Sequence, residues 1–425
     1  MTEAAGSFRG RVHRGTQQIG GTCIELEAAG ERILLDLGLP LDADGASDDL
    51  LPPVAGLRVE DPALRAIVLS HGHGDHWGLL PLCRPDVPLA MGAATARIMR
   101  AAAPFVPNGF VPNGFAPDVS FELNDRRTFQ TGPFCITPYL VDHSAYDAYA
   151  LLIEAAGRRL FYSGDIRAHG RKGALFERLV NHPPGGIGTM LMEGSCLGRL
   201  DEHTQFPTED EIEARLTESF KQPGFVILSA SAQNIDRIVS IYRACKRSGR
   251  TLLLDLYAME ILRATGNERL PNAGWPNLSV YVPEYQRRHI ARNKRFDLLD
   301  PYKSARIYRE RITEIADRSV MLFRPAMADD VETANLWPGT RAIWSQWDGY
   351  LTDGPGARLK ADLAARGVPI EIIHTSGHAS ILDLKRLANA IRPDRLVPVH
   401  TFEGDSFARY FENVTRRSDG EWWEV

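Results

Sequence analysis

The stretch Ser70-His71-Gly72-His73-Gly74-Asp75-His76 places three histidines and one aspartate within six positions, directly after the apolar run 66–70. The whole chain of 425 residues has only 12 histidines, so this density is not expected by chance. The apolar run predicts a buried strand that ends where the histidines begin. Imidazole and carboxylate groups together suit zinc, and manganese or iron also accept them. One tight loop can therefore supply ligands to two adjacent metal ions.

Polar residues also end three other predicted strands in the first half of the chain. Asp36 ends the run 32–36, His143 follows the run 139–141, and Asp165 follows the run 159–162. Taken singly, a strand-end aspartate is usually a turn or helix cap, and a lone histidine is usually not a ligand. Together with the histidine-rich loop, they predict one site at the strand ends of a layered α/β fold.

In this order, Asp36, His71-x-His73-x-Asp75-His76, His143 and Asp165 resemble the ligand motifs of the metallo-β-lactamase fold. The resemblance implies an α/β protein built as an αββα sandwich. It also implies two divalent metal ions, with Zn²⁺ expected first and Mn²⁺ as an alternative. The implied ligands are His71, His73 and His143 for the first metal, Asp75 and His76 for the second, and Asp165 as a bridge, with Asp36 orienting the ligand loop.

Three later motifs select a branch of this family. Glu193 ends the strand 189–193, His378 closes His374-Thr-Ser-Gly-His378, and His400 ends Val397-Pro-Val-His400. These resemble motifs A, B and C of the β-CASP nucleases, a branch that includes ribonuclease J. The resemblance implies a metallo-β-lactamase domain in two parts, 1–204 and 366–425, interrupted by an α/β β-CASP-like insert at 205–365.

The pattern of the insert agrees with an α/β unit, because strands and helices alternate after Glu209. Strands are expected at 225–230, 251–255, 319–323 and 341–344, and helices at 233–248, 257–264 and 303–316. Beyond the insert, the pattern predicts helices at 381–391 and near 406–415 with a strand at 396–399 between them.

The resemblance implies hydrolysis of a phosphodiester by a hydroxide that bridges two metals. His400 would complete the second metal site, His378 would bind a phosphate oxygen or assist the leaving oxygen, and Glu193 would orient a histidine. Asp75, His378 and Glu193 are therefore the residues expected to be required for catalysis. The turn Ser376-Gly377 is expected to bind phosphate through its amides. Ser231 either holds a neighbouring phosphate or caps the helix 233–248.

The function implied is an RNA-processing nuclease, an exonuclease, an endonuclease or both, acting on single-stranded RNA. A second interpretation is a hydrolase of a small ester, thioester or phosphodiester, which gives no use to His378. A third is a non-catalytic RNA-binding subunit. Members of that kind usually lose metal ligands, whereas here every expected ligand position is filled.

The distribution of charge along the chain bears on whether its partner is a nucleic acid. The formal net charge is −5, which by itself favours no nucleic-acid partner. Residues 286–311, however, contain nine basic and three acidic residues, a net +6, with Phe296, Tyr302 and Tyr308 among them. This segment is either a groove for a single strand or a solvated helix face with i,i+4 ion pairs. Both interpretations stay open at this point.

The five cysteines are scattered, odd in number and without CxxC spacing, which favours reduced thiols in a cytoplasmic protein. Residues 1–15 show no signal peptide, and no apolar run approaches the roughly 18 residues of a membrane helix. We therefore expect no membrane partner, and a homo-oligomer is compatible with the sequence. The tandem repeat Val-Pro-Asn-Gly-Phe at 106–115 predicts a loop.

Overall fold

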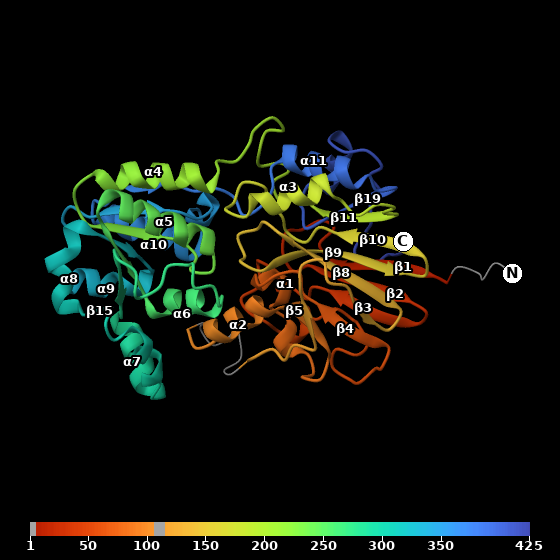
Figure 1. Ribbon diagram of the computed structural model, residues 1–425, viewed down its shortest axis with the longest axis horizontal. Helices are drawn as coiled ribbons and strands as arrows, with labels where there is room; N and C mark the ends of the chain where they lie inside the picture. Colours follow the sequence, from red (N-terminus) through yellow and green to blue (C-terminus); the bar gives the residue numbers. More distant parts are fainter. Residues whose placement is uncertain (1–5, 106–114) are drawn as a thin grey trace. The chain divides into compact units, whose positions relative to one another are not determined.

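The computed structural model describes residues 6–105 and 115–425. The repeat at 106–115, except Phe115, lies outside these residues. The chain forms two compact units (Figure 1). The first combines Met1–Phe206 with Gly377–Val425, and the second is Pro207–Ser376.

Two sheets make up the centre of the first unit. The first sheet has the strand order β20-β1-β2-β3-β4-β5-β6. Its strands are β1 (Phe8–Arg14), β2 (Cys23–Ala28), β3 (Glu31–Leu35), β4 (Leu64–Val68), β5 (Leu89–Gly92), β6 (Phe121–Leu123) and β20 (Trp422–Glu424). The second sheet has the order β19-β11-β10-β9-β8-β7. Its strands are β7 (Phe129–Thr131), β8 (Phe134–Val141), β9 (Ala148–Ala155), β10 (Arg158–Tyr162), β11 (Thr189–Glu193) and β19 (Arg395–Val399).

The two sheets pack face to face, and helices cover their outer faces. Ile24 and Val68 of the first sheet share a buried cluster with Leu151 and Tyr162 of the second. This follows from the alternation of apolar side chains along each strand, which gives both sheets an inward apolar face. The helices of this unit are α1 (Gly74–Trp77), α2 (Ala93–Ala102), α3 (Gly173–Asn181) and α11 (Ile381–Ile391).

The outer layers complete an αββα sandwich. Met99 of α2 packs with Ile67 on the first sheet. Phe176 of α3 and Leu384 of α11 pack with Phe161 on the second. The expected fold class, a metallo-β-lactamase αββα sandwich with an inserted α/β domain, is thereby confirmed in its architecture.

Strand direction decides where the polar strand ends meet. β3 and β4 are parallel neighbours, as are β10, β11 and β19. β8 runs antiparallel to β9, and β9 antiparallel to β10, so β8 runs in the same direction as β10. The carboxyl ends of these strands therefore gather Asp36, His71, His143, Asp165 and His400 at one edge of the sandwich.

The second unit is built on one all-parallel sheet with the order β15-β14-β13-β16-β12-β17-β18. Its strands are β12 (Val226–Ser229), β13 (Thr251–Leu254), β14 (Leu278–Tyr281), β15 (Arg306–Ile307), β16 (Ser319–Leu322), β17 (Arg341–Trp344) and β18 (Ile370–Ile372). Its helices are α4 (Glu209–Lys221), α5 (Ile235–Ser248), α6 (Leu256–Ala264), α7 (Glu284–Asn293), α8 (Arg309–Ile315), α9 (Ala328–Thr333) and α10 (Gly354–Ala365). The last strand of this sheet along the chain is β18, which pairs with β17, so the second unit extends at least to Ile372.

Two expected helices form only in part. In the segment 303–316, Arg306–Ile307 pair with β14 as an edge strand, so the helix begins only at Arg309. In the segment 406–415, a 3-10 helix ends at Arg409. Beyond it, Asn413 adopts φ 55° and Val414 forms a bridge with Leu396, so the helix does not extend to these residues. In both places, pairing with a strand far along the chain outweighs the local helical pattern.

Candidate metal centre

The histidine-rich loop connects β4 to the short helix α1, and this turn spreads its side chains. His71 Nε2 lies 3.2 Å from His73 Nδ1, and His143 Nε2, from the end of β8, lies 3.1 Å from the same atom. Three ring nitrogens from two loops thus converge on one point. Gly38 lets the neighbouring loop approach, because a Cβ there would lie 1.8 Å from the Asp75 carbonyl oxygen.

A second group lies beside the first. It consists of Asp75, His76 and His400, whose ligand atoms fall within 4.8 Å of one another, as do those of His71, His73, His143 and Asp165. Helix α1 supplies Asp75 and His76, and the end of β19 supplies His400. Each group has the size and the nitrogen and oxygen donors of a site for a divalent transition metal.

Asp165 lies between the two groups. Its Oδ2 is 3.2 Å from His76 Nε2, 3.6 Å from His71 Nε2, 3.7 Å from His400 Nε2 and 3.9 Å from His143 Nε2. One carboxylate oxygen thus faces both sets of imidazoles, which is the arrangement that a bridging ligand requires.

Four buried polar atoms of this cluster make no hydrogen bond within the described part of the chain: His76 Nε2, His143 Nδ1, His400 Nε2 and Asp165 Oδ1. Unsatisfied buried polar atoms are rare in folded proteins, because each loses its hydration without a replacement. Coordination to metal ions would satisfy His76 Nε2, His400 Nε2 and Asp165 Oδ1. The donors present therefore fit the divalent ions expected from the sequence.

Charge in the metal-free cluster is unevenly distributed. Burial lowers the pKa of His71, His143 and His400, which keeps these rings neutral and able to offer a lone pair. Burial opposes the charged form of His76 too, but nearby carboxylates, led by Asp165, raise its pKa well above the ordinary value. The pKa of Asp165 is lowered, because the histidines outweigh its burial. His76 would release a proton on binding a metal.

Asp36 orients His76, a member of the second group. Its carboxylate accepts hydrogen bonds from Ser70 N at 2.7 Å, Ser70 Oγ at 2.8 Å, Tyr162 OH at 2.7 Å and His76 Nδ1 at 2.8 Å. Asp36 is fully buried and has φ 60°, a left-handed conformation that aspartate tolerates better than most residues. The bond to Nδ1 leaves Nε2 of His76 directed to the cluster.

His400 is held in a similar way. Its Nδ1 lies 2.8 Å from Thr22 Oγ1 and 3.4 Å from the Gly20 amide, so its Nε2 faces Asp75 and Asp165. Its backbone has φ 51°, a conformation in which Gly15 O accepts from its amide at 2.7 Å. Sequence reasoning missed Thr22 and Tyr162 as supporting residues. The only signal for Tyr162 was its position three residues before Asp165.

Glu193 and His378 form a pair at the rim of the cluster. His378 Nδ1 lies 3.2 Å from Glu193 Oε1 and 3.8 Å from Asp165 Oδ2. Glu193 also accepts from the amides of Ile166 at 3.2 Å and Ser195 at 3.1 Å, which fixes its carboxylate. Burial lowers the pKa of His378, but Glu193 and then Asp165 raise it to about 9. In the metal-free protein His378 is therefore a cation at neutral pH.

A buried ion pair joins two of the ligand loops. Arg167 Nε donates to Asp142 Oδ1 at 3.2 Å, and Arg167 N donates to Asp142 O at 2.7 Å. Both side chains are fully buried. Asp142 precedes His143 and Arg167 lies two residues after Asp165, so the pair fixes the distance between these loops. Sequence reasoning did not identify it.

The residues expected to bind phosphate divide between the two units. Gly377 begins the second part of the first unit, and a Cβ at this position would lie 2.6 Å from Ser144 Oγ, beside His143. Ser376 and Ser231 belong to the second unit. The alternative of helix capping by Ser231 is wrong, because α5 begins at Ile235 and its N-cap is Asn234, whose side chain accepts from Arg237 N.

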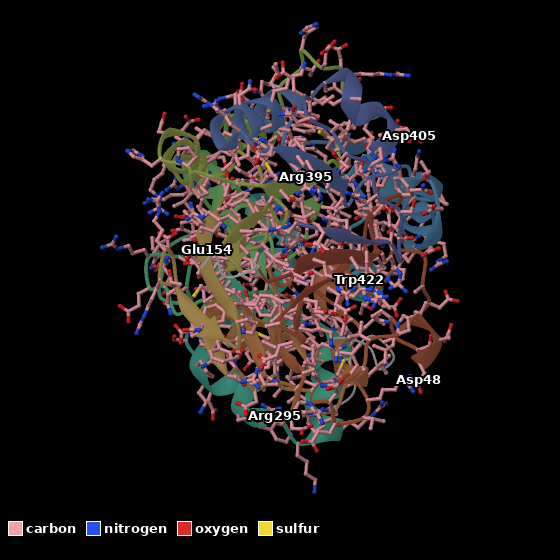
Figure 2. All side chains as sticks on the ribbon, turned by 90° about the vertical axis from the view of Figure 1, so that its right-hand side faces the viewer. Asp48, Glu154, Arg295, Arg395, Asp405 and Trp422 are labelled. Carbon is pink, nitrogen blue, oxygen red and sulfur yellow. The ribbon has the colours of Figure 1, made fainter. Side chains whose placement is uncertain are left out.

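Some of the cations in the basic segment 286–311 form ion pairs within the second unit. Five of its nine cations form ion pairs, and two of these, Arg287 and Arg288, pair with Glu284 on α7. Arg295 (labelled in Figure 2) pairs with Asp297 at 2.9 Å. Tyr302 is buried and donates to Glu260. These contacts favour the interpretation as a solvated helical face.

All five cysteines are free thiols, and Cys23, Cys196 and Cys245 are buried. No helix in the described ranges is long and apolar enough to cross a membrane.

Two protein-family models match the chain, and both matches lie mainly in the first unit. Residues 31–214 match the model of the beta-lactamase superfamily domain. Residues 367–422 match the model of a Zn-dependent metallo-hydrolase RNA specificity domain. The first match contains the ligands from His71 to Asp165, and the second contains His378 and His400.

The chain is also similar to curated ribonucleases over most of its length. Ribonuclease J of Mycobacterium tuberculosis is 25% identical over 429 residues, which cover 93% of this chain and 69% of that protein. Ribonuclease J of Mycoplasma pneumoniae is 23% identical over 414 residues, covering 91% of this chain and 66% of that protein.

A solved structure shares the complete fold. The crystal structure of a protein of unknown function from Enterococcus faecalis V583 superimposes with a TM-score of 0.79 at 22% identity, covering 99% of this chain and 100% of that one. Sandwich and insert are therefore found together elsewhere.

Proposed function

Because the chain belongs to the metallo-β-lactamase superfamily and is a metallo-hydrolase with an RNA-specificity domain, we propose that it is a ribonuclease that hydrolyses phosphodiester bonds of single-stranded RNA at two divalent metal ions. One observation carries the proposal: His71, His73 and His143 on one side, and Asp75, His76 and His400 on the other, share the carboxylate of Asp165. The distant full-length similarity to ribonuclease J supports RNA as the substrate.

The ligand set would hold Zn²⁺, or Mn²⁺, at both positions. When bound, such ions supply a water of lowered pKa and positive charge opposite the phosphate. The protein's own contribution is to fix the coordinating atoms. Asp36 accepts a hydrogen bond from His76 Nδ1, and Thr22 Oγ1 contacts His400 Nδ1, so Nε2 of each ring is left for the metal.

We propose that His378 acts on the phosphate and that Glu193 positions His378. Glu193 is held by two backbone amides and in turn holds His378 Nδ1. The imidazole is thus fixed beside Asp165, where it can donate to a phosphate oxygen or to the leaving oxygen. We assign Asp75, His378 and Glu193 to catalysis on this basis.

The amides of the turn Ser376-Gly377 are proposed to bind a phosphate oxygen, and Ser231 a neighbouring phosphate. For Gly377 the support is steric, since a side chain there would displace Ser144 next to His143. For Ser231 the support is its exposure at the carboxyl end of β12.

The test compares the wild-type chain with Asp75→Asn. Asp86→Asn is the matched control, because Asp86 lies in the same unit and its side chain is 65% exposed. The panel contains 5′-monophosphorylated and 5′-hydroxyl RNA, single-stranded DNA, a thioester and a lactone, each with and without a chelator. We expect metal-dependent RNA cleavage by the wild type and Asp86→Asn, and none by Asp75→Asn.

Metal-dependent hydrolysis of the thioester or lactone with no cleavage of nucleic acid would make the chain a small-molecule hydrolase. RNA binding with no hydrolysis of any substrate would make it a binding subunit. Either result would overturn the nuclease proposal.

A further inference from the structure

Two large aromatic side chains stand exposed on one loop of the second unit. Trp347 is 42% exposed and Tyr350 is 52% exposed, and their ring centroids lie 5.2 Å apart at an angle of 82°. Both belong to the loop that follows β17. Aromatic rings are normally buried, so two neighbouring exposed rings need an explanation.

The loop is built to hold these rings in place. Trp344 is buried, and its indole Nε1 donates to Trp347 O at 3.0 Å. The Trp347 ring lies against the backbone of Gly349, where a Cβ would be 2.3 Å from the ring. Leu351 is buried and anchors the end of the loop in the apolar core of the unit. The rings are therefore presented by a fixed backbone, which reduces the entropy lost on binding.

The loop lies at the edge of the sheet where ligands of parallel α/β units bind. All strands of this sheet are parallel, so the residues after β17 lie at the same edge as those after β12, β13 and β16. Arg324, directly after the residues that extend β16, lies at this edge. β16 and β17 flank β12, so their ends are about 10 Å apart.

Arg324 is a cation held in a fixed position. Its Nε donates to Asp255 Oδ2 at 2.7 Å, and its guanidinium lies 4.8 Å from the centre of the Tyr257 ring. Its side chain remains 24% exposed. An oriented guanidinium that remains partly exposed is suited to a phosphate group.

The composition of the loop indicates which kind of ligand would bind to the two rings. Residues 345–354 contain no lysine or arginine, and the residues between and after the rings include Asp348, Thr352 and Asp353, all exposed. Each ring offers a flat π face, which suits an unpaired nucleobase. Separate ring faces in a polar loop, with one cation along the same edge, match the two components of single-strand binding, base stacking and phosphate pairing.

We propose that Trp347 and Tyr350 form a stacking platform for unpaired nucleobases, and that Arg324 pairs with a phosphate of the same strand. This rests on the proposed function, because it names how that substrate is held. It places base recognition on the loop after β17 and not on the basic segment 286–311.

The test measures binding of a fluorescein-labelled 12-mer oligoadenylate to the full chain by anisotropy, with a chelator present to prevent cleavage. An abasic oligomer of the same length is the second probe. Trp347→Ala and Tyr350→Ala should each weaken oligoadenylate binding about 5- to 150-fold and leave abasic-oligomer binding unchanged. Trp347→Phe should restore most of the affinity. Arg324→Gln should weaken both probes.

Phe296→Ala is the matched control, because Phe296 is 58% exposed in the same unit but lies in the basic segment. It should bind oligoadenylate like the wild type. Loss of affinity in Phe296→Ala with none in Trp347→Ala would overturn the proposal. So would equal losses for both probes in Trp347→Ala.

The metal-loaded enzyme separates this proposal from the proposed function. With Trp347→Ala, KM for RNA should rise by a larger factor than the factor by which kcat falls. If the wild type cleaves RNA and Trp347→Ala has an unchanged KM, the platform is refuted and the nuclease stands. If the wild type cleaves no nucleic acid yet binds oligoadenylate through Trp347, the nuclease is refuted and the platform stands.

Discussion

Asp36→Asn tests whether Asp36 positions a metal ligand. The carboxylate accepts from His76 Nδ1 at 2.8 Å and from Tyr162 OH at 2.7 Å, and it also accepts two bonds from Ser70. Asparagine has nearly the same shape, and its one carbonyl oxygen can still accept from Ser70. The amide NH₂ would then face His76 Nδ1, and the imidazole would lose the acceptor that sets its tautomer.

The magnitude follows from these contacts. Loss of a hydrogen-bonding partner behind a metal-bound histidine typically lowers metal affinity about 10- to 100-fold, or roughly 1.4 to 2.7 kcal/mol. In the metal-free protein, the position of Oδ2 would lose three bonds, from His76 Nδ1, Ser70 Oγ and Tyr162 OH. One bond to a charged group typically contributes about 1.5 to 3 kcal/mol, so the unfolding free energy should fall by at least that amount. The larger effect should fall on the site of Asp75, His76 and His400, because Asp36 bonds His76 directly and reaches His71 through Ser70 Oγ.

The assay is a competition titration with a chromophoric zinc chelator, combined with urea unfolding of the metal-free chain. We expect one of the two zinc ions to bind 10- to 100-fold more weakly in Asp36→Asn. Tyr162→Phe is the control, because it removes a contact to the same carboxylate but leaves the bond to His76. It should cost about 1 kcal/mol of stability and keep both affinities near the wild-type values.

The reasoning is refuted if Asp36→Asn binds both ions like the wild type while its unfolding free energy falls. Asp36 would then stabilise the fold around Ser70 and Tyr162 and have no role in orienting His76.

Three further predictions concern single contacts. Buried Glu25 has a pKa lowered to about 2, because its histidine and arginine partners outweigh its burial. It should therefore add about 3 kcal/mol of stability above pH ~4.5, and this contribution should be lost as the pH falls toward ~2. Urea unfolding of Glu25→Gln should lack this part of the pH dependence. His378→Ala should bind two metal ions, counted by elemental analysis, yet lose about 10²- to 10⁴-fold in turnover; loss of an ion would show that its role is ligation. Asp142→Asn should weaken metal binding as well as stability by breaking the pair with Arg167, whereas Glu209→Gln, which breaks an equally buried pair in the second unit, should lower stability alone; equal metal affinities in the two variants would contradict a bracing role.

Much of the fold was predictable because its signals are local. The run before Ser70 and the strand 189–193 are apolar, and each is long enough for one buried strand. The helices 233–248 and 381–391 show a clear 3.6-residue period, and both form, the first from Ile235. The helices expected at 303–316 and 406–415 form only in part, because Arg306–Ile307 pair with β14 and Val414 forms a bridge with Leu396 of β19. No local pattern reports such long-range partners.

The sequence by itself determined the donor types of the metal centre, since imidazole and carboxylate chemistry belongs to the residues and the motif spacing orders them along the chain. Only the tertiary structure decided how they meet. Parallel strands bring Asp165 and His400 to the same edge, although 235 positions separate them. The acceptors behind the ligands, the brace of Asp142 with Arg167, and the exposure of Trp347 follow from contacts between distant segments. Such contacts form only when apolar burial packs those segments together, and a residue's own neighbours in sequence do not specify them.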